Sequence, residues 1–277
     1  MQKFLVGLML WMFTNAVAYA AMSDIKAANN LLTVQAMVLN VDYGETDSTG
    51  KLLDTEQGRI QGRMFAFSGM AGNGNFYYQL QYNRNEGQTD YVGGTISPPS
   101  PYGSVLSVSG ARVTDYGLRL GKGYDYAYPE PRGGYARMLT PYLELGRHEW
   151  FRGVNAGETY THNYYALGLM WQLSDAASRL VYTLNVMAGR TVGAWIDVEP
   201  STAYSPPIPA LNVALGSAPV YRAGIALDYA LTAGLHLKAG VDIERFSYGR
   251  SEVVGGYYEP DSTTTLLKYM AGLGFAF

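Results

Sequence analysis

Leu267–Phe277, which reads L-K-Y-M-A-G-L-G-F-A-F, alternates between two kinds of residue. Counted back from the last residue, every second position is apolar or aromatic: Phe277, Phe275, Leu273, Ala271, Tyr269 and Leu267. The positions between them are smaller or polar: Ala276, Gly274, Gly272, Met270 and Lys268. A period of two predicts a β-strand with two different faces. Because the apolar face continues to the last residue, this strand is not expected to be a frayed terminus in water.

An aromatic last residue on such a strand resembles the closing strand of bacterial outer-membrane β-barrels, which typically end in Phe. The resemblance implies a protein of the outer membrane of a Gram-negative bacterium, in contact with outer-membrane lipid. It also implies that Phe277, Phe275 and Tyr269 form the signal that the barrel-insertion machinery recognises during assembly. In such a barrel this strand pairs with the first strand, expected near 32–43, and Lys268 points into the lumen.

The first twenty residues have the pattern of a secretory signal peptide. Lys3 precedes an apolar run, which is followed by the small-x-small cleavage pattern Ala18-Tyr19-Ala20. We expect cleavage between Ala20 and Ala21, which leaves 21–277 as a single barrel domain without a separate periplasmic domain. A membrane-spanning helix is not expected, because the apolar run is shorter than the ~18 residues that a span requires.

The composition limits the chemistry. The chain has no Cys, so it has no disulfides, no thiol catalysis and no thiolate metal site. Hydrophobic residues make up 48% of the chain while its mean hydropathy is only −0.07, as expected when apolar and polar residues alternate. The net charge is −3 and the basic residues are dispersed, which gives no indication of a nucleic-acid partner. No cofactor or metal is predicted.

Alternation of this kind predicts an all-β fold, a transmembrane antiparallel up-and-down β-barrel of about ten strands. The expected strands are 32–43, 57–70, 75–86, 107–121, 137–151, 159–173, 178–193, 219–231, 234–247 and 264–277. An even number allows the first and last strands to pair antiparallel, and eight or twelve strands remain open. The first two strands are ambiguous, because Val34 and Leu39 compete for the lipid face, as do Phe65 and Met64. A bulge midway would resolve the conflict.

The second face of the strands carries Gly, Ala, Gln, Asn and Tyr with scattered charges of both signs, which suits a crowded polar lumen. The apolar face then contacts lipid, and closure of the sheet satisfies every backbone group. The connections alternate between short turns and longer segments, expected at 44–54, 86–106, 152–158, 194–218 and 248–262. With a periplasmic N-terminus, the long segments lie outside the cell. One connection, 123–136, is long where a short turn is expected.

Some outer-membrane barrels are enzymes, so catalytic patterns among the ionisable residues would indicate an active site. Omptin-type proteases are also ten-stranded barrels, and they carry paired Asp and an Asp-x-His near the outer rim. This sequence has no Asp-x-Asp and no Asp-x-His, so that site is not expected. The serine-hydrolase, zinc-protease and phosphate-loop motifs are absent as well.

The best candidate for a metal or proton-transfer site lies on both sides of the connection at 153–158. His148 and His162 lie at nearly equal distances from it, so they are expected to be cross-strand neighbours on the inward face, with Glu144, Trp150 and Tyr164. Two histidines and a carboxylate can bind a metal or move a proton. Because no third ligand or catalytic partner can be identified by spacing, the sequence favours the interpretation that these side chains fill the lumen and form hydrogen bonds there.

A larger charged set is also predicted to point inward. Its members are Arg59, Arg63, Asp115, Arg119, Glu144, Arg179, Arg222, Asp228, Lys238, Asp242, Glu244 and Lys268. One interpretation is a charged constriction that selects solutes. The favoured interpretation is an internal salt-bridge network, because buried charges need partners and a ten-stranded barrel is narrow.

These patterns predict an integral outer-membrane barrel with a filled lumen, which acts as a structural or surface-interaction protein rather than as an enzyme. Its partner would be an extracellular ligand or a host surface that contacts the outer loops. Two of these loops are rich in Pro and Tyr, at 91–106 and 198–218. One alternative is a channel for passive diffusion of small solutes. The other is an enzyme that acts on lipid or peptide at the outer rim, near His148 and His162.

Overall fold

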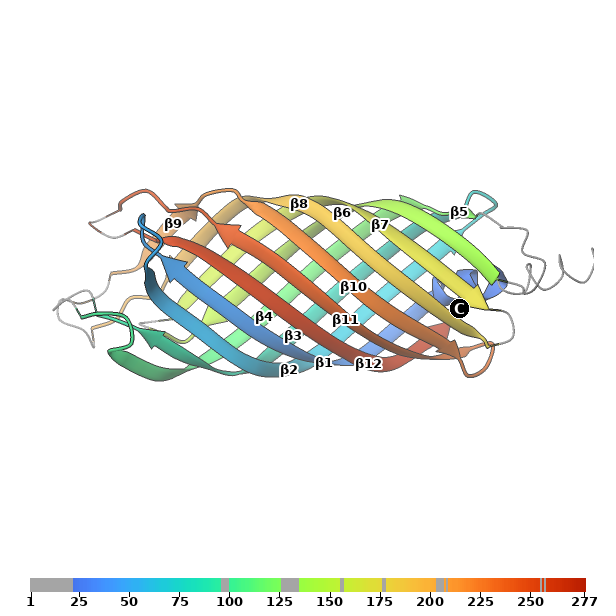
Figure 1. Ribbon diagram of the computed structural model, residues 1–277, viewed down its shortest axis with the longest axis horizontal. Helices are drawn as coiled ribbons and strands as arrows, with labels where there is room; N and C mark the ends of the chain where they lie inside the picture. Colours follow the sequence, from blue (N-terminus) through green and yellow to red (C-terminus); the bar gives the residue numbers. More distant parts are fainter. Residues whose placement is uncertain are drawn as a thin grey trace, which may run out of the picture.

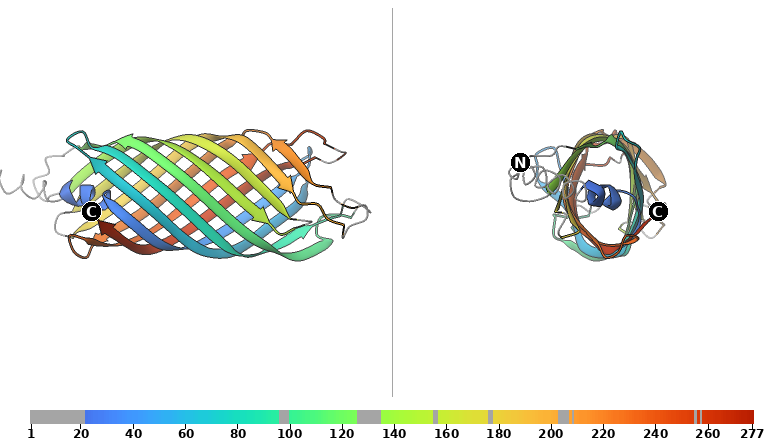
Figure 2. Two further views of the ribbon diagram at one scale, coloured as in Figure 1. Left: turned by 180° about the vertical axis from the view of Figure 1, so that it is seen from behind. Right: turned by 90° about the vertical axis from the view of Figure 1, so that its right-hand side faces the viewer.

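Ten strands of the chain form one closed antiparallel β-barrel, seen from the side in Figure 1 and end-on in Figure 2. The computed structural model describes residues 22–95, 100–125, 135–154, 157–175, 178–202, 207, 209–254, 256 and 258–277. The expected up-and-down barrel of ten strands is confirmed. Two short additional strands, β5 and β9, pair with the wall strands β6 and β8.

Eight of the ten wall strands are longer than predicted. In chain order they are β1 (Leu31–Thr46), β2 (Leu52–Ala71), β3 (Phe76–Gly93), β4 (Val105–Lys122), β6 (Tyr135–Arg152), β7 (Glu158–Asp175), β8 (Leu180–Val198), β10 (Pro219–Ala230), β11 (Leu235–Tyr248) and β12 (Asp261–Ala276). The additional strands are β5 (Tyr124–Asp125) and β9 (Leu211–Leu215). A tilted membrane crossing needs only ~9–11 residues, so the wall continues beyond the membrane.

Several outer connections are correspondingly shorter than predicted. The segment expected at 44–54 is mostly strand, and only 47–51 connects β1 to β2. The Gly, Pro, Ser and Asp of these segments predict loops, but much of this sequence extends the wall strands instead. Of the long periplasmic connection at 123–136, residues 126–134 lie outside the described ranges.

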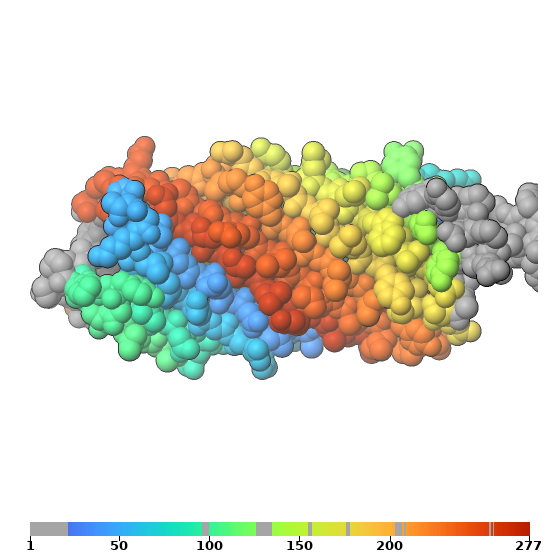
Figure 3. Space-filling view, in the orientation of Figure 1, coloured from blue at the N-terminus to red at the C-terminus, as the bar shows by residue number. Residues whose placement is uncertain are grey.

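The barrel closes between its first and last strands. Strand β1 pairs with β12 from Leu31 opposite Ala276 to Thr46 opposite Asp261, as predicted. In Figure 3 the blue band of β1 lies directly against the red band of β12 along the molecular surface. Strand β1 also pairs with β2, and β8 pairs with β10, so each wall strand has two neighbours.

The first two strands keep the same lipid-facing side along their whole length, without the midway bulge that would have switched it. On β1 the exposed residues are Leu32 and Val34, whereas Leu39, Val41 and Tyr43 are buried in the lumen. The register shift between β1 and β2 lies at the far end, between Glu45 and Thr46. The alternation is therefore uninterrupted, and the ambiguity arose because the lumen itself contains an apolar layer.

A short helix over 22–28 precedes β1 and lies inside the periplasmic end of the barrel, where Figure 2 shows it within the ring of strands. Its Ile25 is fully buried. The backbone nitrogen of Met70 donates to Asn30 Oδ1 at 2.8 Å, and Asn29 Nδ2 donates to Gln172 Oε1 at 2.7 Å. Within the described ranges, no helix is long and apolar enough to cross a membrane.

Candidate functional site

The middle of the lumen is filled by an ionic network. Glu144 of β6 accepts from Arg119 Nε at 2.6 Å and from Arg222 Nη1 at 2.8 Å. Arg222 also lies 3.0 Å from Glu244, whose Oε2 accepts from Lys268 Nζ at 2.9 Å. These groups come from β4, β6, β10, β11 and β12, so the network ties opposite walls together. Buried charges persist only when they are paired in this way.

The two predicted histidines stand above this network. His148 and His162 are directly opposite each other on β6 and β7, and their rings stack at 5.0 Å between centroids. His148 Nδ1 lies 2.6 Å from Asp115 Oδ1, and His162 Nδ1 lies 2.6 Å from Tyr248 Oη. Both rings are almost fully buried, 1% and 0% exposed, and Phe246 packs against each of them. This Asp–His pair therefore belongs to the packed interior and not to an open site.

A second ionic cluster, the Arg152 cluster, fills the outer end of the lumen. The guanidinium of Arg152 contacts four carboxylates, from Glu45 at 3.2 Å, Asp54 at 3.4 Å, Glu56 at 2.7 Å and Glu158 at 3.2 Å. It also lies over the ring of Tyr43, 4.3 Å from the centroid. Tyr160 Oη donates to Glu259 Oε1 at 2.5 Å and lies 3.4 Å from Glu45 Oε1, which ties the β11–β12 connection to this cluster.

The Arg152 cluster was not predicted, because its acidic residues are spread over segments that were expected to be loops. Arg152 and Glu158 bound one such segment, and Glu45, Asp54 and Glu259 lie in two others. The only sequence signal was the strict alternation of Tyr43 with Glu45 and of Asp54 with Glu56, which continues the inward face of each strand.

The carboxylates of this cluster outnumber its cation, which raises the pKa of Asp54 and of the neighbouring Glu259. Asp54 lies near the outer end of β2, well outside the apolar belt, and burial together with the charge of Glu45 raises its pKa to about 8. Burial and the charges of Glu45 and Glu158 also raise the pKa of Glu259 above its usual range. A carboxyl whose pKa is raised by folding stabilises the protein below its unfolded pKa. That stabilisation is lost as the pH rises through the folded pKa.

We therefore expect the free energy of unfolding to fall between about pH 4 and pH 8, by on the order of 1–3 kcal/mol. Asp54→Asn should reduce this dependence, because an amide cannot ionise. Urea unfolding in detergent micelles, followed by the heat-modifiable gel shift, measures the effect. Asp42→Asn is the matched control, because Asp42 is exposed on the outer face of β1. Equal pH dependence in the wild type and Asp54→Asn would contradict the assignment.

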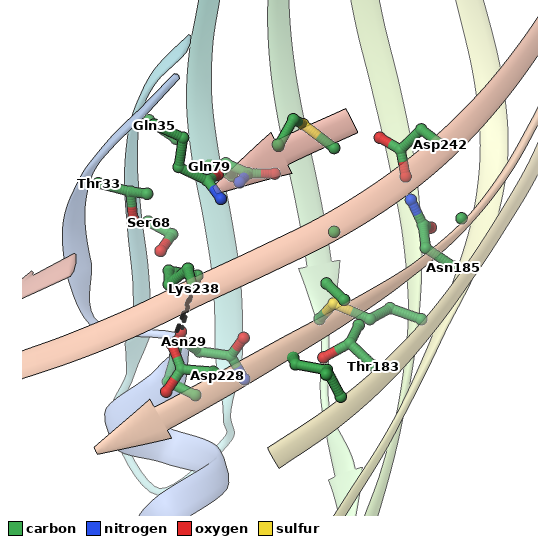
Figure 4. A pocket seen from close by; sticks show the side chains of 18 of the residues that line it. Asn29, Thr33, Gln35, Ser68, Gln79, Thr183, Asn185, Asp228, Lys238 and Asp242 are labelled. Atoms are coloured by element: carbon green, nitrogen blue, oxygen red, sulfur yellow. Dashed lines mark hydrogen bonds and ion pairs between the residues drawn. The ribbon is translucent and has the colours of Figure 1, made fainter. Parts of the chain in front are cut away.

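The periplasmic third of the lumen is polar but less tightly filled. Asp228 pairs with His236 at 2.6 Å and with Lys238 at 3.3 Å, and Lys238 Nζ donates to the carbonyl of Ala28 in the helix at 3.4 Å. A cavity of about 130 Å³ separates the helix from the ionic network. In Figure 4, Gln35, Gln79, Asn185 and other polar side chains surround this space. It is large enough for several waters.

The structure places all ten residues of the proposed lumen or ligand set inside the barrel. They are Glu144, His148, His162, Tyr164, Arg119, Arg222, Asp228, Lys238, Asp242 and Glu244. Three further predictions were wrong: Arg59 and Arg63 are exposed on the outer face of β2, and Arg179 is exposed at a periplasmic turn. The strand parity of β2 could not be fixed from its mixed apolar pattern. Among the described residues, no group of His, Asp and Glu is arranged to hold a metal ion.

The residues of the proposed assembly signal lie on the outer wall. Phe275 and Tyr269 are 44% and 43% exposed, as lipid-facing side chains are in the absence of lipid. Phe277 stacks on Phe67 of β2, with 4.9 Å between ring centroids. The proposed cleavage point between Ala20 and Ala21 lies outside the described residues.

Solved structures with a similar fold are bacterial outer-membrane proteins. The outer membrane protease OmpT from Escherichia coli is 8% identical, with 89% of this chain and 95% of that chain covered and a TM-score of 0.54. The translocator domain of autotransporter NalP from Neisseria meningitidis is 12% identical, covering 100% and 98%, with a TM-score of 0.41. Neisserial surface protein A is 11% identical, covering 89% and 97%, with a TM-score of 0.34. No family model and no curated protein matches the sequence.

This chain therefore has the fold of bacterial outer-membrane β-barrel proteins, and it resides in the outer membrane of a Gram-negative bacterium. The identity with OmpT is too low to extend beyond the fold. The paired Asp and Asp-x-His of omptins are absent from this sequence.

Proposed function

We propose that the protein is a non-conducting outer-membrane barrel that acts as a structural or surface-interaction protein through its extracellular connections. The observation that carries this proposal is the filling of the lumen at three levels. The Arg152 cluster occupies the outer end, the Glu144–Arg222–Lys268 network occupies the middle, and the helix over 22–28 occupies the periplasmic end. A channel would require these buried ion pairs to separate, and separating them is costly.

The outer connections support an interaction role, because they expose apolar and aromatic side chains above the membrane. Val253, Val254 and Tyr258 in the β11–β12 connection are 61%, 42% and 41% exposed. Tyr102 in the β3–β4 connection is 38% exposed. Exposed aromatic side chains of this kind form recognition surfaces in other proteins. The predicted partner is an extracellular ligand or a host surface. The remaining prolines and tyrosines of these connections lie partly outside the described residues.

Reconstitution in a planar lipid bilayer tests the proposal. The wild-type barrel is expected to give no steady single-channel steps, because no continuous water path crosses three filled layers. A conducting porin in the same bilayer provides the positive control, and the heat-modifiable gel shift verifies that the inserted protein is folded. Regular steps from the wild type would overturn the proposal and favour the solute channel.

An enzymatic role has less support. Among the residues that the structure describes, the Asp–His pair nearest the predicted rim, Asp115 and His148, is buried behind Phe246 and Tyr248. A substrate outside the barrel would have to displace these rings to reach the imidazole.

A further inference from the structure

The outer wall of the barrel changes abruptly from apolar to basic at one height. Lys122, Arg137 and Asp175 face outward at the periplasmic ends of their strands. Above these ends, the outward-facing residues of each wall strand are apolar or aromatic up to a certain position. The next outward residue is arginine on five of the ten strands: Arg63, Arg84, Arg147, Arg190 and Arg245. On the other five strands it is uncharged: Asn40, Thr114, Asn163, Pro219 and Thr265. No acidic residue occupies this position on the ten strands, but Arg84 and Arg147 pair with the next outward residues of their own strands, Glu86 and Glu149.

Two of these arginines are direct cross-strand neighbours. Arg63 of β2 pairs in register with Arg84 of β3, and both side chains are exposed. Like charges directly opposite each other on neighbouring strands are destabilising unless an anion lies between them. Arg84 bonds Glu86 on its own strand at 2.7 Å, whereas Arg63 has no partner among the described residues. The pair therefore provides a guanidinium that is free to bind an anion.

An apolar depression in the wall begins immediately below this pair. It crosses β2, β3, β4 and β6, and it is lined by the row of Phe65, Tyr82 and Tyr116, with Arg147 at the end of the same row. The rings of Phe65 and Tyr82 lie 6.5 Å apart, and those of Tyr82 and Tyr116 lie 5.3 Å apart. Leu118 and Leu145 continue the depression toward the periplasmic side. The result is an apolar groove with the Arg63–Arg84 pair beyond its outer end. Arg147, at the end of the aromatic row, is paired with Glu149 at 2.7 Å.

We propose that this groove is a binding site for a phosphorylated, acylated lipid of the outer leaflet. The phosphate group binds Arg63 and Arg84, and an acyl chain lies along the row from Phe65 to Tyr116. The charge complementarity supports this ligand, because arginine matches phosphate oxygens with paired hydrogen bonds. Its position supports it too, since the arginines lie where the apolar belt ends and lipid headgroups begin.

The site differs from general contact with the membrane in a way that can be measured. Arg245 of β11 occupies the same height and is equally exposed, but its cross-strand neighbours are Tyr221 and Thr265 rather than a second arginine. General attraction of the belt to anionic lipid would involve Arg245 as much as Arg63. A specific lipid-binding site requires both the Arg63–Arg84 pair and the groove.

The experiment uses the full barrel refolded in a zwitterionic detergent and native mass spectrometry with added lipid A, which is a phosphorylated, acylated disaccharide. Arg63→Gln is expected to weaken lipid binding about tenfold, the effect of one charge-assisted hydrogen bond, whereas Arg245→Gln should leave it unchanged. Dephosphorylated lipid A should bind more weakly than lipid A, and inorganic phosphate at equal concentration should not compete.

A second variant tests the groove without touching the charges. Leu118→Trp fills the depression between Leu80 and Leu145, and it is expected to lower lipid A binding while the heat-modifiable gel shift remains normal. Equal losses in Arg63→Gln and Arg245→Gln would overturn the proposal, as would full competition by inorganic phosphate. Because all these substitutions lie on the outer wall, the test does not depend on whether the lumen conducts.

Discussion

Replacing Arg152 with methionine should lower the free energy of unfolding by about 3–5 kcal/mol, the range found when one member of a buried ion pair is removed. The guanidinium is 1% exposed in its side chain and is the cation that Glu45, Asp54, Glu56 and Glu158 share. Without it, these carboxylates repel one another in a confined space. We expect the outer end of the barrel to open first, because the cluster joins β1, β2, β6 and β7 there.

Urea unfolding in detergent micelles, read from the heat-modifiable gel shift, measures this loss. Arg112→Met is the matched control, because Arg112 is exposed on β4 directly opposite Phe151, one residue before Arg152. It lies over the Phe151 ring at 5.3 Å and should cost less than about 1 kcal/mol, as exposed charges do. In the Arg152→Met background, Glu56→Gln should restore part of the stability. If Arg152→Met and Arg112→Met lost the same stability, the cluster would not hold the outer lumen together.

The barrel fold was predictable because lipid and lumen impose opposite demands on alternate residues. Over 235–244 of β11 the apolar residues face outward and the charged residues face inward, and over 267–275 of β12 only Met270 departs from this pattern. Parity alone therefore placed Asp242, Glu244 and Lys268 correctly. The closing pair of β1 and β12 followed from the even strand number. The ten strands were found for the same reason, since each crosses the same two environments.

The remaining features depend on contacts between segments that are distant in sequence. Strand β1 buries Met37, Leu39 and Val41 in the lumen, so its inward face is as apolar as its outward face and parity could not distinguish them. The helix over 22–28 is too short to recognise, and it is held by tertiary contacts such as that between Asn29 and Gln172. The Asp115–His148 pair joins neighbouring strands, but its partner Lys268 comes from the far end of the chain.

Replacing Lys268 with methionine should have the second large effect, also about 3–5 kcal/mol. The ammonium is 3% exposed and bridges Asp115 Oδ2 at 3.1 Å and Glu244 Oε2 at 2.9 Å in the middle of the lumen. After its removal, Glu244 still has Arg222, whereas Asp115 faces only the His148 imidazole and the amide of Asn83. The penalty should therefore arise mainly from Asp115.

A double variant tests whether the loss of stability arises from Asp115 rather than from Glu244. Adding Asp115→Asn to Lys268→Met removes the unpaired charge, so the double variant should regain most of the lost stability, because an amide needs no counter-charge in the lumen. Lys122→Met is the matched control, since Lys122 is exposed at the periplasmic end of β4, where its ammonium lies over the Tyr124 ring at 5.5 Å. The measurement compares the urea unfolding midpoints of the wild type, Lys268→Met, the double variant and Lys122→Met. If Asp115→Asn gave no recovery, Lys268 would act through packing of its aliphatic stem, and the ionic network would not be what closes the middle of the barrel.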